Sequence, residues 1–81
     1  MTTYQMFQRK DGRNIISSES KSPYPPSDER GREAIASLYR VAQKAGLKES
    51  YGVSSMDKNG SRVWYDQFGR PVDEENAFRR L

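Results

Sequence analysis

The chain has 81 residues, a hydrophobic fraction of 33% and a formal net charge of +3. This length indicates one domain that spans residues 1–81. Histidine and cysteine are both absent, which excludes the triads, zinc sites, haem ligation and thiol chemistry that depend on those side chains. We therefore expect a non-catalytic binding protein that uses no cofactor and no metal.

The low apolar content predicts a core built on aromatic residues and methionine, and such a small core is marginally stable. Dimerisation or binding to a partner would stabilise it. No apolar run approaches the ~18 residues that a membrane span needs, so we expect no membrane association. The first residues also lack the apolar region of a signal peptide, so a cytoplasmic location is expected.

Residues 3–17 are predicted to form a β-hairpin around Asp11-Gly12, because both central residues of a two-residue turn need positive φ. In that register Phe7 lies opposite Ile16. Residues 18–27 are rich in serine and proline and are interpreted as a connector. It is either a stiff crossover from the hairpin to a helix, which we favour, or a docking segment for a proline-recognising domain.

Residues 28–45 predict a helix, with Ser27 or Asp28 as its N-cap and Gly46 just after its end. Leu47 is expected to fold back onto Ala42. One face of this helix carries an apolar stripe, formed by Ala34, Ile35, Leu38, Val41, Ala42 and Ala45.

Residues 52–57 and 61–66 predict a second hairpin, joined by Asn59-Gly60 as a two-residue turn. That register pairs Met56 with Val63 and Ser54 with Tyr65. A turn over residues 66–69 leads to a short edge strand at residues 70–72. Residues 73–81 are expected to form a final helical turn or two, with Arg79 and Arg80 in the last turn and with Phe78 and Leu81 against the sheet.

The fold class that follows is α+β, with element order ββα-ββ(β) and a short C-terminal helix. Two β-hairpins form an antiparallel sheet, and the main helix packs on one of its faces. A sheet covered on one face cannot hide every aromatic residue of this chain. We therefore expect an exposed aromatic anchor for a protein partner, formed by Trp64, Tyr65, Arg62 and Tyr51. The competing interpretation places Trp64 in the core against Ile35 and Leu38, with Tyr65 outward.

Basic residues near the two predicted hairpin tips suggest nucleic-acid binding as an alternative function. If both tips lie at one end of the sheet, they form a basic edge that contacts phosphates, while Trp64 and Tyr65 stack on bases. The residues of this edge are Arg9, Lys10, Arg13, Lys58, Arg62 and Arg70.

In its size, polarity and simple architecture the chain resembles the small accessory proteins that phages and mobile elements encode. This resemblance implies an inhibitor or adaptor that docks on a larger protein or nucleoprotein complex. The alternative is a weakly sequence-specific module that binds DNA or RNA.

Overall fold

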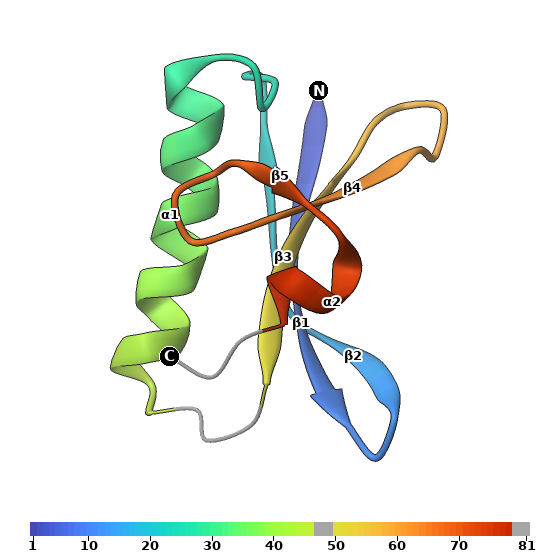
Figure 1. Ribbon diagram of the computed structural model, residues 1–81. Coiled ribbons are helices and arrows are strands. Elements are labelled where there is room, and N and C mark those ends of the chain that lie inside the picture. The colour runs from blue at the N-terminus through green and yellow to red at the C-terminus, as the bar shows by residue number, and fades with distance from the viewer. Residues whose placement is uncertain (47–49, 79–81) are drawn as a thin grey trace.

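The computed structural model describes residues 1–46 and 50–78, which form one antiparallel sheet with a helix on each side (Figure 1). Its strands lie in the order β2-β1-β3-β4-β5. The elements along the chain are β1 (Thr2–Lys10), β2 (Arg13–Ser22), α1 (Glu29–Lys44), β3 (Tyr51–Met56), β4 (Arg62–Tyr65), β5 (Pro71–Val72) and α2 (Glu74–Ala77). The predicted α+β fold, with one main helix and a short C-terminal helix, is confirmed.

The first hairpin has the predicted turn and register. Asp11 and Gly12 have φ values of 52° and 75°, and Phe7 pairs with Ile16. Beyond this point a β-bulge leaves Ser17 without a partner residue, and β2 continues to Ser22. The predicted connector therefore begins too early, because its first five residues, 18–22, belong to the strand.

The remaining connector turns the chain into α1. The N–H of Asp28 donates to the carbonyl of Pro25 at 3.0 Å, and the Asp28 carboxylate caps the helix by accepting from the N–H of Arg30 at 2.8 Å. Gly31 permits this tight entry, since a Cβ there would lie 2.0 Å from the Pro25 carbonyl oxygen. The chain therefore crosses from the sheet to α1 here, and the role of the prolines stays a prediction. The predicted contact of Leu47 with Ala42 lies outside the described residues.

The second hairpin forms, but the predicted register is wrong by one residue. Val53 pairs with Tyr65, and Ser54 pairs with Trp64. The reason is the loop: Gly60 has positive φ, whereas Asn59 does not. The Asp57 carboxylate accepts from the N–H groups of Asn59 and Ser61, and the loop closes as a turn followed by a glycine bulge.

The turn after β4 repeats this arrangement. The Asp66 carboxylate accepts from the N–H groups of Phe68 and Arg70, and Gly69 takes the positive φ. The predicted short edge strand is confirmed as β5. Helix α2 follows at once and has four residues. The predicted positions of Arg79, Arg80 and Leu81 lie outside the described residues.

The hydrophobic core lies between α1 and the sheet. At its centre the Tyr39 hydroxyl shares its one proton between the carbonyls of Tyr65 (2.6 Å) and Ala77 (3.1 Å) and accepts from the N–H of Val53 (3.2 Å). One side chain of α1 thus joins β3, β4 and the end of α2. The core residues are Tyr4, Met6, Ile35, Leu38, Tyr39, Ala42, Tyr51, Val53 and Tyr65. No helix within the described residues is long and apolar enough to span a membrane.

Candidate functional site

The side chains of a strand alternate between its two faces, and the observed register fixes which residues share a face. Tyr51, Val53 and Tyr65 point toward α1 and are buried in the core. The opposite face, which we call the second face, is formed on the sheet by Gln5, Phe7, Ser54, Arg62 and Trp64. Helix α2 packs against part of it, as Figure 1 shows.

Aromatic rings cluster on the second face. The ring centroid of Trp64 lies 5.4 Å from that of Phe7 and 5.1 Å from that of Phe78, which follows α2. Gly52 lets α2 approach, because a Cβ at this position would lie 3.2 Å from the backbone of Ala77. Phe7 and Phe78 are buried and Trp64 is half-buried. The protein therefore covers most of this apolar surface itself.

Arg62 lies across the middle of the second face. One terminal nitrogen, Nη1, donates to the Oε1 of Gln5 at 2.9 Å and to the Oγ of Ser54 at 2.6 Å. The guanidinium carbon lies 4.8 Å from the ring centroid of Phe7 and 5.9 Å from that of Trp64. Gln5 and Ser54 are buried, so Arg62 satisfies the Oε1 of Gln5 and the Oγ of Ser54, while the Nε2 of Gln5 donates to Glu19 at 3.1 Å.

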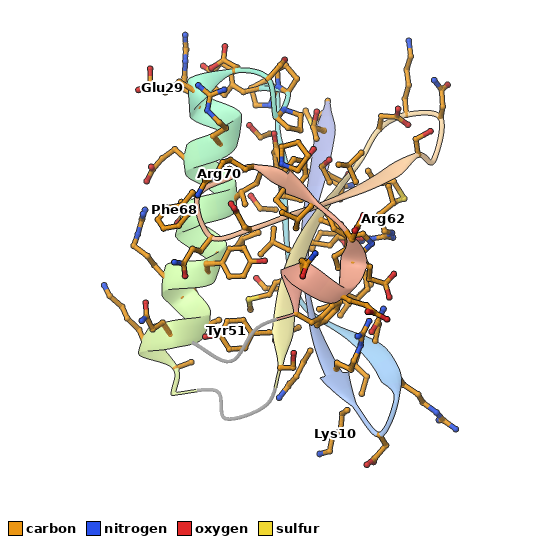
Figure 2. The ribbon with its side chains drawn as sticks, in the orientation of Figure 1. Lys10, Glu29, Tyr51, Arg62, Phe68 and Arg70 are labelled. Carbon is orange, nitrogen blue, oxygen red and sulfur yellow. The ribbon has the colours of Figure 1, made fainter. Side chains whose placement is uncertain are left out.

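The rest of this guanidinium is open. Within the described residues no carboxylate lies within 4.0 Å of Arg62, Nε has no hydrogen-bond partner, and Nη2 contacts only the Met56 sulfur at 3.8 Å. Arg62 is exposed, and Figure 2 shows it on the side of the sheet away from α1. Nε and Nη2 form the edge with which arginine binds a carboxylate through two parallel hydrogen bonds.

Arg9 lies on the same face as Arg62, but its guanidinium is already paired. Its Nη2 forms an ion pair with Glu74 at 2.7 Å, its Nε donates to Asn14, and its guanidinium stacks on Phe78 at 4.1 Å. The charge of Arg9 is therefore used inside the fold, whereas that of Arg62 remains available.

Comparison with family models, with curated proteins and with solved structures finds no match for this chain. Its function has to be argued from this geometry alone.

The structure places the four predicted anchor residues on two different faces. Arg62 and Trp64 share the second face, whereas Tyr51 and Tyr65 are buried beneath α1, as Figure 2 shows for Tyr51. The competing interpretation is also wrong, because Trp64 lies on the other side of the sheet from α1. The second error follows from the displaced register, which depends on the Asp57 loop. The first does not, because Trp64 and Tyr65 are neighbours in one strand and lie on opposite faces in any register.

The six basic residues do not form one edge. The pairs Gln8–Tyr51 and Thr3–Met56 show that β1 approaches its hairpin tip where β3 begins, so the two tips lie at opposite ends of the sheet (Figure 1). Lys10 and Arg13 lie at one end, Lys58 lies at the other, and Arg62 lies between them. Arg9 and Arg70 are ion-paired with Glu74 and Asp66. These six residues therefore lack the single basic edge that the nucleic-acid hypothesis requires.

Two buried tyrosines have raised pKa values. Burial raises the pKa of Tyr4 to about 12, with smaller contributions from Tyr65 and Asp28, and burial also raises the pKa of Tyr51. Both shifts keep the hydroxyl protonated and belong to the core. Within residues 1–46 and 50–78, acidic side chains form no group of three that could hold a metal ion.

Sequence reasoning missed Gln5 and Ser54, the two residues that hold Arg62 in place. Both are small or polar residues within strands, where alternation predicts a face but not a partner. The signal that would have located them is Asp57-x-x-Gly60, which favours a turn with a glycine bulge and gives the observed register.

Proposed function

We propose that this protein is a non-catalytic binding domain that docks on a larger protein through the second face and acts as an inhibitor or adaptor. The observation that supports this is the open Nε–Nη2 edge of Arg62, held in place by Gln5 and Ser54. The partner in this proposal presents an aspartate or glutamate to that edge.

The arginine suits this role because its position is set before a partner arrives. Hydrogen bonds on Nη1 and the rings of Phe7 and Trp64 restrict the side chain, so little rotamer entropy remains to be lost on binding. Arginine and tryptophan are also the residue types that dominate binding energy at protein interfaces.

An exposed apolar side chain lies on the same face as Arg62. Ile16 pairs with Phe7 across the first hairpin, so it lies on the second face, and 52% of it is exposed. A partner surface that places an apolar side chain next to a carboxylate would match Ile16 and Arg62 together. This combination supports a protein partner more strongly than a phosphate backbone, which offers no apolar group at that position.

The test is retention of partners from a nuclease-treated lysate of the cells that produce the protein, followed by affinity measurement with the purified partner. We expect Arg62→Ala to raise Kd by roughly thirtyfold, the effect of losing an interface hot spot of about 2 kcal/mol. Arg62→Lys should also weaken binding, since lysine keeps the charge but loses the two-donor edge. Lys58→Ala is the control that removes one exposed charge away from the second face.

Equal binding by Arg62→Ala and the wild-type protein would contradict the proposal. So would a partner that disappears after nuclease treatment and whose binding weakens steeply with salt, because that behaviour marks nucleic acid. The Arg62→Ala variant must retain the wild-type circular dichroism spectrum, and Arg62→Lys keeps the test interpretable if it does not.

A further inference from the structure

A second surface lies on the other side of the sheet, where α1 leaves the ends of β4 and β5 uncovered. It is an open groove of about 600 Å³ between the start of α1 and these two strands. Val63 and Pro71 face it and are exposed, and Tyr65 forms part of its floor. Pro26 of the connector closes one side. The floor of the groove is therefore apolar.

Two guanidinium groups border this apolar floor. Arg32 comes from α1 and Arg70 from the loop that joins β4 to β5, and Figure 2 shows Arg70 beside the helix. Arg32 donates to the carbonyl of Ser27 at 3.2 Å, and within the described residues no carboxylate lies within 4.0 Å of it. Arg70 is 69% exposed and touches the Asp66 carboxylate through Nε at 3.3 Å.

The Asp66 carboxylate of this ion pair already accepts hydrogen bonds from its own loop. One Asp66 oxygen accepts from two N–H groups of its own loop, and the Asp66 side chain is only 11% exposed. Among the described residues that line the groove there is no aspartate or glutamate. A ligand in the groove therefore meets an apolar floor and positive charge on two sides.

From this arrangement we propose that the groove binds an extended segment of a protein in which an acidic residue is flanked by apolar residues. The apolar side chains lie on Val63, Tyr65 and Pro71, and the carboxylate accepts hydrogen bonds from Arg32 and Arg70. Charge complementarity selects this occupant over a basic or a purely apolar segment. Because Arg62 lies on the opposite side of the sheet, a domain with both surfaces bridges two proteins, as an adaptor does.

The test uses a defined probe, the peptide acetyl-Gly-Leu-Asp-Leu-Gly-amide, titrated into ¹⁵N-labelled protein and followed by NMR. We expect a Kd on the order of 1 mM, as befits a short flexible peptide. The amide shifts should concentrate at Arg32, Val63 and Gly69. The counterpart with asparagine in place of aspartate should bind about tenfold more weakly, because it loses the charge-assisted hydrogen bonds.

Single substitutions then test the two arginines. Arg32→Gln and Arg70→Gln should each weaken the aspartate peptide severalfold, whereas Arg40→Gln, a matched change elsewhere on α1, should not. Equal binding of the two peptides, or wild-type affinity in both groove variants, would overturn the proposal. Two separate positions keep the test decisive if one variant loses the wild-type amide spectrum.

The amide map also separates this groove from the second face. Shifts at Gln5 and Ser54 without shifts at Arg32, Val63 and Gly69 would overturn the groove while supporting carboxylate binding by Arg62. Shifts in the groove that persist in Arg62→Ala would support the groove whether or not the second face binds a partner.

Discussion

The two faces of the sheet are shielded from water in different ways. The face beneath α1 is closed by one long helix, whose buried residues Ile35, Leu38, Tyr39 and Ala42 pack on tyrosine, methionine and valine. Val41 of the predicted apolar stripe is exposed. The second face is closed by the four-residue α2, a cluster of aromatic rings and one arginine. Where α1 covers its face, little is left for a partner, and the groove on that side lies beyond this cover, at β4 and β5. A guanidinium that covers its face instead brings an open polar edge to the surface.

This difference predicts a division of roles. Apolar burial stabilises a fold roughly in proportion to the area removed from water, so most of the stability of this protein should reside on the α1 face. The second face combines buried polar groups with an exposed charge, which suits recognition better than stability. Substitutions on the two faces should therefore have distinct effects.

The largest loss of folding stability is expected for Ile35→Ala. Ile35 is fully buried beneath the sheet, and removing its side chain should cost about 2–5 kcal/mol. Domains are stable by roughly 0.05–0.15 kcal/mol per residue, so this loss is a large part of the total. Urea denaturation followed by circular dichroism measures it.

The matched control is Ile16→Ala, which makes the same kind of change on the exposed edge strand β2. Its cost should stay below about 0.5 kcal/mol. Similar costs at the two positions would refute the division between the faces.

A smaller effect is expected for Tyr39→Phe. The substitution keeps the ring in the core but removes the hydroxyl that bonds Val53, Tyr65 and Ala77. Leaving buried backbone groups without this partner should cost about 1–3 kcal/mol. Tyr24→Phe is the control, because its hydroxyl accepts from Arg30 at an exposed site and its loss should cost less than about 1 kcal/mol. Equal costs for both would show that the hydroxyl of Tyr39 does not organise the core.

An element of this fold can be predicted from the sequence when the residues that determine it are close together in the chain. Asp11-Gly12 lies between strands with no competing turn, so the register of the first hairpin was predicted as far as the bulge beyond Phe7. The cap and the apolar positions of α1 lie within one short segment, so its bounds were predicted within one residue at each end. Asn59-Gly60 is compatible with two loop types, and the Asp57 side chain decides between them. A shift of one residue in the pairing moves every side chain of a strand to the opposite face relative to its partner strand.

The candidate site depends on contacts between residues that are far apart in the sequence. The basic tips are separated by the pairing of β1 with β3, residues about fifty positions apart in the chain, which no local pattern encodes. The second face is covered because α2 packs on Gly52 and Phe78 packs on Trp64. Arg62 and Trp64 were chosen correctly as residues of one face, since alternation within a single strand requires no knowledge of its partners.

The smallest effect concerns Tyr4, which lies on the α1 face and donates to the carbonyl of Tyr24 at 2.7 Å. Tyr4→Phe should cost about 1 kcal/mol at neutral pH, the typical value of one hydrogen bond. The pKa of Tyr4 rises from 10.0 to about 12 on burial. Above pH 10 the unfolded chain therefore loses this proton while the folded protein keeps it, so folded stability falls between pH 10 and pH 12.

The phenylalanine variant has no such group, so its stability should decline less over the same interval. The stability advantage of the wild-type protein over Tyr4→Phe should consequently fall as the pH rises from 10 to 12 and reverse its sign within this interval, because a pKa shift of this size outweighs one hydrogen bond. Urea denaturation of both proteins at several pH values measures this difference. A constant difference would mean that Tyr4 ionises equally in the folded and unfolded states, and the α1 face would then be open to water at this position.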